Sequence, residues 1–376
     1  MMNRKTLISV SLAAGLVLGM AAYPAVKQIE QQQALTAAAA SSTTADGWKF
    51  TYDDAHCEIT GCTAAVQGDV RIPAAIAVEG KDLPVTAVMS NFYYSGSDIT
   101  GLTIPASVTI LPNQFCELKK NLKTVTFEGE LVTLPNSAFL SCTSLTTVKL
   151  PKGLMTIGSA AFRNCTRLES IQLPDTVSTL GAYAFADSES LKSITIPGSV
   201  TAIPDSAFSG CAALASVTIG DGVKSVGGSA FAKCTSLTEI TFPKSVNKVS
   251  SGQIFSGCTN LESVTFENPD CEIGNVYGTA DKPLTIYGYE NSTAQAYCAG
   301  RDKNLGEKSY VIFKSIGEKP APQPVQDTGL FCDANGDETV DVTDAQLVLN
   351  YYVKSMAGKN PSWYEMTKNP KAPDAP

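Results

Sequence analysis

Histidine is almost absent from this sequence, and its absence removes several kinds of chemistry. The 376 residues include a single histidine, His56. Serine and cysteine nucleophiles are usually activated by a histidine base, and histidine-based zinc sites need several of these side chains. The sequence therefore excludes a zinc site built on several histidines and argues against both kinds of nucleophilic catalysis. We interpret His56 as an ordinary loop or strand residue.

Positive charge is also scarce. The 28 lysines and arginines are outnumbered by 36 acidic side chains, which gives a formal net charge of −8. Nucleic acids and anionic membranes attract basic surfaces, so neither is expected as the main partner. Apolar residues make up 44% of the chain and charged residues 17%, a balance typical of a protein that buries a core.

Recognisable catalytic motifs are missing as well. The sequence contains no P-loop, no G-x-G-x-x-G after a strand and no G-x-S-x-G. No pair of carboxylates recurs where the two would face each other across a cleft, as glycoside hydrolysis requires. We therefore expect a protein that binds rather than catalyses, with an enzyme as the lesser alternative.

The chain has one long apolar run, at its N-terminus. Arg4 and Lys5 precede residues 6–22, which carry no charge, and small residues follow. This order is typical of a signal peptide, predicted over residues 1–25, and an uncleaved N-terminal anchor is the alternative. Residues 26–46, rich in Gln, Ala, Ser and Thr, are predicted to be a disordered linker. We expect the mature protein to be secreted and extracellular, with no membrane segment after signal cleavage.

Phenylalanine recurs at nearly constant intervals through the middle of the chain. The gaps between successive members are 24, 23, 23, 23, 23 and 24 residues. The positions are Phe115, Phe139, Phe162, Phe185, Phe208, Phe231 and Phe255. A fixed period of about 20–50 residues is typical of solenoids and other repeat architectures. The middle of the chain is therefore predicted to be a stack of similar coils.

Each unit also carries apolar residues at strand spacing. The recurring positions are Leu145, Val148 and Leu150 in one unit and Leu191, Ile194 and Ile196 in another. Alternation with period two predicts a short strand with one apolar face. The proline that ends most of these segments stops ladder pairing because it lacks an N–H. Units stacked about 4.8 Å apart as a parallel sheet would bury a continuous core, with the phenylalanines closing the opposite wall.

The unit SL..I.LP..V..IG..AF..C resembles the short leucine-rich repeat of the BspA-like family of bacterial surface proteins, over residues 91–266. The resemblance implies a curved solenoid with parallel strands on its concave side, and roles in adhesion and in recognition of proteins or hosts. We predict an α/β but β-rich fold, a leucine-rich-repeat solenoid of units of about 23 residues. Residues 47–90 and 267–316 are predicted to be its N-terminal and C-terminal caps, since terminal coils must hide their apolar faces.

The sequence has 11 cysteines, and six of them follow the repeat. These six are Cys116, Cys142, Cys165, Cys211, Cys234 and Cys258, with Ser188 at the matching position of the remaining unit. One interpretation is a column of buried thiols, each a weak hydrogen-bond donor to the turn backbone. The other is a set of disulfides between neighbouring coils. Cys57 and Cys62 are predicted to lie in a strand of the N-terminal cap.

The same alternation identifies the outward side chains of the strands. One expected row is Thr126, Lys149, Gln172, Thr195, Thr218, Thr241 and Thr265, and the other is Thr124, Thr147, Ser170, Ser193, Ser216, Glu239 and Ser263. These rows carry little charge and no aromatic ring, whereas tight protein or sugar sites usually need aromatic or arginine side chains. Two interpretations stay open: the hydroxyl residues serve strand formation alone, or they form a broad and weak contact surface.

Beyond residue 266 the repeat degrades. The segment PLTIYGYENSTAQAYCAGRDKN predicts a strand and then a short helix that begins near Ser292 or Thr293. Residues 317–329 are rich in proline and are predicted to form an extended linker. A separate small helical module is expected over residues 330–376.

The segment DANGDETVDVTD has the spacing of an EF-hand calcium loop. Oxygen-bearing side chains fall at loop positions 1, 3, 5, 9 and 12, and position 7 supplies a backbone carbonyl. The predicted metal ligands are Asp333, Asn335, Asp337, Thr339, Asp341 and Asp344. Because calcium binds six to eight hard oxygens around a tight loop, Ca2+ is the expected cofactor.

An aspartate at position 12 and a single exiting helix make this loop similar to a type I dockerin repeat, over residues 332–357. Dockerins bind cohesin modules on the scaffold proteins of polysaccharide-degrading assemblies such as cellulosomes. The resemblance implies that the cohesin-facing residues are Val342, Thr343, Leu349, Asn350 and Lys354. The chain departs from that family at Glu338, where glycine permits the sharp turn, and in having one repeat where a dockerin has two. Calcium binding is therefore better supported than cohesin docking.

Two functions from different classes follow. The leading hypothesis is a secreted, non-catalytic binding protein whose solenoid recognises a protein or polysaccharide and whose calcium module tethers it to a cohesin-bearing scaffold. The alternative is a secreted or surface adhesin whose calcium loop is only structural.

Overall fold

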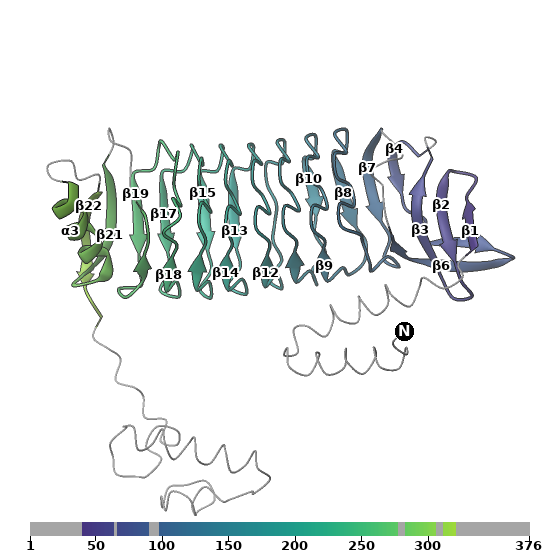
Figure 1. Ribbon diagram of the computed structural model, residues 1–376. Helices are drawn as coiled ribbons and strands as arrows, with labels where there is room; N and C mark the ends of the chain where they lie inside the picture. The colour runs from purple at the N-terminus through teal and green to yellow at the C-terminus, as the bar shows by residue number, and fades with distance from the viewer. Residues whose placement is uncertain (1–39, 64–65, 90–97, 277–282, 306–310, 321–376) are drawn as a thin grey trace, which may run out of the picture. The chain divides into compact units, whose positions relative to one another are not determined.

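The computed structural model describes residues 40–63, 66–89, 98–276, 283–305 and 311–320 of the chain. These residues form a solenoid of stacked β coils with one short helix at its C-terminal end (Figure 1). The prediction of a β-rich leucine-rich-repeat solenoid is therefore confirmed.

The N-terminal part of the described chain is a five-stranded sheet in the order β1-β2-β3-β6-β5. Its strands are β1 (Ala40–Thr43), β2 (Trp48–Tyr52), β3 (Cys57–Cys62), β5 (Ala75–Val78) and β6 (Lys81–Val88). Trp48, Phe50 and Ile59 are buried in the same core as the coils, so this sheet covers the first coil. Strand β3 confirms that Cys57 and Cys62 belong to a capping strand.

Strand β1 corrects the expectation that residues 26–46 are a disordered linker throughout. It pairs antiparallel with β2, with Ala40 opposite Tyr52. The turn between the two strands is held because Trp48 N donates to Thr44 Oγ1 at 2.9 Å. The small and polar composition of this segment suggested disorder, but backbone pairing with β2 decides its conformation.

Most coils contribute one strand to a first row and a shorter strand to a second row. The first row consists of β4 (Gly68–Arg71), β7 (Ile99–Ile104), β8 (Thr124–Phe127), β10 (Thr147–Lys149), β13 (Ser193–Ile196), β15 (Ser216–Ile219), β17 (Glu239–Phe242), β19 (Ser263–Phe266), β21 (Leu284–Glu290) and β22 (Val311–Glu318). The second row consists of β9 (Thr133–Leu134), β11 (Thr156–Ile157), β12 (Thr179–Leu180), β14 (Ala202–Ile203), β16 (Ser225–Val226), β18 (Lys248–Val249) and β20 (Glu272–Ile273). Paired strands within each row are parallel, as the stacking of repeats requires.

The first row is hydrogen-bonded in three pieces rather than one continuous sheet. The pieces are β10-β8-β7-β4, β13-β15 and β17-β19-β21-β22. Residues 170–173, in the coil between β10 and β13, lie outside the assigned strands. Their side chains nevertheless keep the expected alternation, with Ser170 and Gln172 exposed and Ile171 and Leu173 buried. The outward face therefore continues past the break.

The predicted phenylalanine column is confirmed. Consecutive ring centroids from Phe139 to Phe231 lie 5.3–5.6 Å apart, and these rings are fully buried. The rings of Phe162, Phe185 and Phe208 are nearly parallel, with interplanar angles of 8° and 2°. Stacked aromatic pairs contribute about 0.5–1.5 kcal/mol beyond their area burial. The column therefore holds neighbouring coils in a constant register.

The first member of the column is out of step with the others. Cys116 N donates to the carbonyl oxygen of Ala138, the residue before Phe139. In the next coil Phe139 N donates to the corresponding atom, Ala161 O. Cys116 thus occupies the backbone position of Phe139, and Phe115 precedes it, which accounts for the 24-residue gap. The Phe115 ring still reaches the column but meets Phe139 edge-on, at 6.2 Å and 73°. Lys119, which is buried, therefore occupies the backbone position that Cys142 has in the next coil.

A column of thiols and one hydroxyl runs beside the rings. The donors are Cys142, Cys165, Ser188, Cys211, Cys234 and Cys258. Each donates to a backbone carbonyl of the preceding coil at 2.8–3.3 Å, for example Cys165 Sγ to Phe139 O. Burial raises the pKa of Cys142 and Cys211 to about 12, so both remain protonated donors at neutral pH. The five cysteines of this column and Cys116 are buried free thiols, and the five donate, which confirms the interpretation as buried donors for these five.

The turns that carry the rings contain left-handed residues. Ala160 and Tyr183 have φ values of 55° and 60°, and matching residues in other coils are similar. A non-glycine residue in this region costs about 1–3 kcal/mol. The conformation aims its N–H at the next coil, so that Ala160 N donates to Ala182 O and Tyr183 N to Asp205 O. These bonds offset the strain and extend the hydrogen bonding between coils from the strands to the turns.

The C-terminal cap consists of β21, helix α3 (Thr293–Leu305) and β22. Strand β22 pairs parallel with β21, and β21 with β19. A Cβ at Gly288 would lie 2.7 Å from Ala294 Cβ, so helix α3 packs directly against the inner face of β21. Ser292 Oγ accepts a hydrogen bond from Gln295 N, which confirms the predicted helix start. Strand β22 extends to Glu318, so the linker predicted from residue 317 begins later than expected.

Replacing Phe185 with alanine should strongly destabilise the solenoid. The ring is fully buried between Phe162 and Phe208, and truncation of a buried phenylalanine costs about 3–5 kcal/mol. The measurement is the free energy of unfolding of the full chain in urea. Thr195→Ala, on the exposed face of β13, is the control and should change that free energy by less than about 0.5 kcal/mol. If Phe185→Ala loses no more than this control, the ring column does not hold the coils together.

Ser188 offers a matched test of the thiol column. Ser188→Cys should cost less than about 0.5 kcal/mol, because it supplies the thiol that the other coils use as the donor toward the matching carbonyl. Ser188→Ala should cost about 1–1.5 kcal/mol, since it removes one of the two hydrogen bonds that Phe162 O accepts, the other coming from Cys165 N at 3.3 Å. Urea unfolding separates the two variants. Equal losses would mean that the column contributes packing alone.

Candidate functional site

The predicted calcium ligands and cohesin-facing residues belong to residues 330–376, which lie outside the described residues. The calcium site and its partner surface therefore stay predictions. Within the described ranges, no group of three or more His, Cys, Asp or Glu side chains is placed to hold a metal ion. The helices of these ranges also lack the length and apolarity that a membrane crossing requires.

The single histidine lies in a turn of the N-terminal sheet, between β2 and β3. His56 Nδ1 is 3.0 Å from Asp53 Oδ1, and the same carboxylate accepts hydrogen bonds from the amides of Ala55 and His56. This arrangement closes the turn. It confirms the interpretation of His56 as an ordinary loop residue.

The outward side chains of the first row form a regular exposed surface. The pairing of strands confirms both predicted rows, with Thr124 opposite Thr147 and Ser193 opposite Ser216. From β8 to Thr241 of β17 every one of the predicted outward side chains is exposed. Short hydroxyl side chains both donate and accept hydrogen bonds, so this surface suits a polar partner that lies along many coils.

The same face gains aromatic side chains at its C-terminal end. Thr265 lies opposite Tyr287, which in turn lies opposite Lys314. Tyr289 is the next outward residue of β21, and both tyrosines are half-buried. The Lys314 ammonium lies 5.8 Å from the centroid of the Tyr287 ring, within the range of a cation–π interaction. We call Tyr287, Tyr289 and Lys314 the tyrosine patch.

The tyrosine patch extends the outward face beyond the two predicted rows. Those rows end at Ser263 and Thr265 and carry no aromatic ring, as expected. The alternation within LTIYGYE does predict outward tyrosines in this strand. The sequence does not show which of its residues continue the outward rows, because the spacing between units changes here. Thr241 and Thr265 are 24 residues apart, whereas Thr265 and Tyr287 are separated by 22. Only the pairing of β19 with β21 shows that Tyr287 continues the row.

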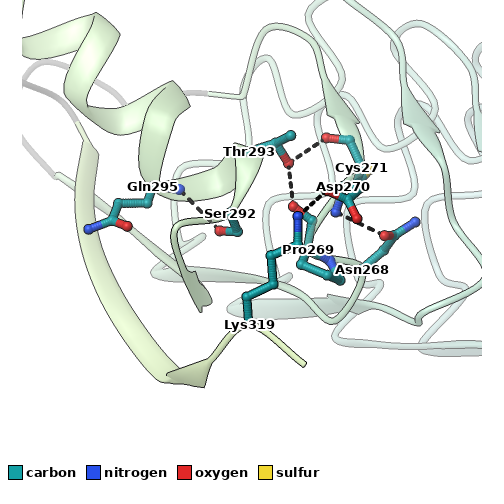
Figure 2. Close-up of polar contacts among 8 residues, drawn as sticks. All are labelled: Asn268, Pro269, Asp270, Cys271, Ser292, Thr293, Gln295 and Lys319. Carbon is teal, nitrogen blue, oxygen red and sulfur yellow. Dashed lines mark hydrogen bonds and ion pairs between the residues drawn. The ribbon is translucent and has the colours of Figure 1, made fainter. Parts of the chain in front are cut away.

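Polar contacts fasten this end of the sheet to the last coil (Figure 2). Thr293 Oγ1 donates to Cys271 O at 2.7 Å, and Thr293 N donates to Pro269 O at 2.9 Å. Lys319 Nζ, just after β22, lies 2.5 Å from Asp270 Oδ1. Helix α3 and the end of β22 therefore both hold the loop after β19. Strand β21, which carries the two tyrosines, connects to the helix that these contacts anchor, so the patch rests on a fixed support.

A shallow hollow lies among the loops that follow β15, β17 and β19. It has a volume of about 620 Å³ and is lined by Asp221, Lys244, Ser245 and Glu267. Gly222 N donates to Ser245 Oγ at 3.2 Å, so part of its polar lining is already engaged. One ammonium between two carboxylates favours no single class of ligand.

The repeat is matched by a family model described as a BspA type leucine rich repeat region, in six copies over residues 86–215 and 201–277. The chain belongs to this family. The matched residues include strands β7 to β19 and both rows of outward hydroxyl side chains. Proteins of the BspA type are generally non-enzymatic binding proteins, often found at the cell surface or secreted.

Several solved structures are similar to this chain. A leucine-rich repeat protein from Bacteroides ovatus is 22% identical with a TM-score of 0.49, and the match covers 65% of this chain and 70% of that one. The T. pallidum leucine rich repeat protein is 26% identical with a TM-score of 0.46, and 52% of this chain and 90% of that one are covered. A leucine rich cell surface protein from Faecalibacterium prausnitzii is 20% identical with a TM-score of 0.32, over 62% and 89% of the two chains. No curated protein matches the chain.

Proposed function

We propose that this chain is an exported, non-catalytic binding protein that recognises its partner through the outward face of the first strand row. The observation that carries the proposal is the row of outward side chains from β8 to the tyrosine patch, exposed as far as Thr241 and half-buried from Ser263 to Tyr289. Side chains on packed strands are held more precisely than side chains on loops, which favours recognition. Stacked rings and coil-to-coil hydrogen bonds supply the rigid support.

The two parts of this face would contribute in different ways. Short hydroxyl side chains lose little conformational entropy on binding, so the rows suit an extended polar contact. Tyrosine dominates many protein interfaces because it combines a large apolar area with a polar tip. We therefore expect the tyrosine patch to supply most of the affinity and the rows to orient the partner. A protein partner fits this division best, and a polysaccharide is the second class of ligand.

We also propose that residues 330–376 bind calcium and tether the solenoid to a cohesin-bearing scaffold. The support is the EF-hand spacing of Asp333, Asn335, Asp337, Thr339, Asp341 and Asp344, together with the dockerin-like exiting helix. Export is supported by the charged start and apolar run of residues 1–25. In this arrangement the scaffold places the protein outside the cell, and the solenoid recognises what lies there.

A surface adhesin is the second candidate. Membership of the BspA-type family favours it, because such proteins are often found at the cell surface. The calcium loop would then stabilise the C-terminal module alone. Both candidates use the same outward face and differ in what residues 330–376 bind.

The recognition face is tested by the variant Tyr287→Ala/Tyr289→Ala. Extracellular proteins that bind the immobilised full chain are purified, and the dissociation constant of each is measured for the wild type and the variant. We expect the affinity to fall at least about tenfold, since each tyrosine of an interface centre can supply about 2 kcal/mol or more. Lys149→Ala, on the same face but far along the row, is the control and should have a small effect. A partner whose affinity is unchanged by the tyrosine variant would place recognition elsewhere.

The tether is tested by calorimetric titration of Ca2+ into the full chain and into Asp333→Ala/Asp337→Ala. We expect a single site in the wild type and none in the variant, because both substitutions remove ligand oxygens. Cohesin modules are then added with calcium or with a chelator. Calcium-dependent cohesin binding supports the tether, whereas calcium binding without a cohesin partner puts the adhesin first. If neither calcium nor cohesins have any effect, the dockerin-like assignment is wrong.

A further inference from the structure

Among the residues that the structure describes, the last strand of the first row has no strand beside its outer edge. Strand β22 ends the order β17-β19-β21-β22, so within the described residues β21 is its only strand neighbour. The outer side of such a strand carries backbone N–H and C=O groups that can pair with another chain. Proteins usually protect these edges by short length, by charge, by proline or by a covering element.

Within the described residues, strand β22 has little of this protection. It is 8 residues long, whereas β1 at the opposite end of the described chain has 4 residues, all of them Ala, Ser or Thr. Ile312 and Ile316 are 48% and 40% exposed. The register with β21 is regular over residues 311–315, and the irregularity follows only after Gly288. The edge is therefore long, regular and apolar.

Lys314 is the one charged side chain that could block the edge over residues 311–316. Its ammonium lies 5.8 Å from the centroid of the Tyr287 ring on the neighbouring strand. The charge is therefore drawn back over the sheet rather than held beyond its edge. Because the lysine remains exposed, the outward positions of β22 read apolar, basic and apolar, at Ile312, Lys314 and Ile316.

We propose that β22 binds an extended segment of a partner protein, which adds to the sheet as a further strand. The segment carries an acidic side chain opposite Lys314 and apolar side chains opposite Ile312 and Ile316, because cross-strand pairs of these kinds stabilise pairing. Main-chain hydrogen bonds provide the affinity, and the alternating side chains provide the specificity. The inference goes beyond the proposed function, because the partner pairs with the backbone edge of β22, although Lys314 also belongs to the tyrosine patch.

A second copy of this chain is a poorer occupant than a partner segment. The outward positions of β22 from Ile312 to Ile316 contain no carboxylate to pair with Lys314. An antiparallel pair centred on Lys314 would place two ammonium groups opposite each other, which is unfavourable. Each copy also carries a net charge of −8, so approach is opposed at low ionic strength.

The test uses the full chain and three labelled peptides in fluorescence anisotropy titrations. The acidic peptide is Thr-Ile-Thr-Glu-Thr-Ile-Thr, the basic peptide has Lys in place of Glu, and the third has proline in place of the two central threonines. We expect the acidic peptide to bind about fivefold more tightly than the basic one. The proline peptide should not bind, because it lacks the N–H groups that pair with the edge. Lys314→Glu should reverse the preference, and Ile316→Thr should weaken both threonine peptides.

The controls separate an edge effect from loss of structure. Lys149→Glu changes the same charge elsewhere on the face and should leave the peptide preference intact. The four substituted residues, Lys149, Ile312, Lys314 and Ile316, are exposed, so unfolding in urea should match the wild type within about 0.5 kcal/mol, or within about 1 kcal/mol for Lys314→Glu, which also removes the cation–π contact with Tyr287. Absence of peptide binding, or a preference that Lys314→Glu does not change, overturns the proposal. So does a dimer in sedimentation analysis that Ile312→Thr dissociates, because the edge would then belong to a second copy. The peptides report on the edge of β22, and Tyr287→Ala/Tyr289→Ala reports on the affinity of a whole partner for the outward face, so the two proposals can fail separately.

Discussion

Hydrogen bonding between successive coils is the interaction on which the rest of the structure depends. It follows three lines: the strand rows, the turn amides such as Phe185 N to Ala207 O at 2.8 Å, and the thiol column. All three sets of hydrogen bonds require the corresponding backbone atoms of successive coils to lie in register. This requirement explains the near-constant step of 23 residues, and it explains why left-handed residues such as Tyr183 are tolerated in the turns.

A support of this kind determines what the surface can do. Because the inner positions are committed to ring stacking and thiol bonds, variation is possible only outward, where hydroxyl side chains predominate. The C-terminal cap does not follow the repeat, so its outward positions can carry different side chains. There the face acquires Tyr287 and Tyr289, and within the described residues the sheet ends in a strand with no strand beside its outer edge. Recognition is therefore expected to concentrate where the repeat ends, on a face whose orientation the repeat fixes.

Much of the fold could be predicted because each coil repeats a local pattern. The spacing of Phe139 to Phe231 and the alternation in each strand specify the coil without tertiary information. Three features could not be predicted in this way. Strand β1 has a composition shared by disordered segments. Cys116 occupies the backbone position that phenylalanine has in the next coil, and only the hydrogen bonds show this. Tyr287 continues the outward row after the spacing between coils has changed. The calcium ligands lie outside the described residues and stay a prediction from loop spacing.

Amide hydrogen exchange of the native full chain tests most directly whether the turns bind one coil to the next. We predict that the amides of Phe162, Phe185 and Phe208 exchange as slowly as the hydrogen-bonded amides of β13 and β15, because both sets open only when coils separate. Turn amides that exchange orders of magnitude faster than those of the strands would contradict this view. The solenoid would then be held together by its sheets alone, and the ring and thiol columns would contribute little to the contact between coils.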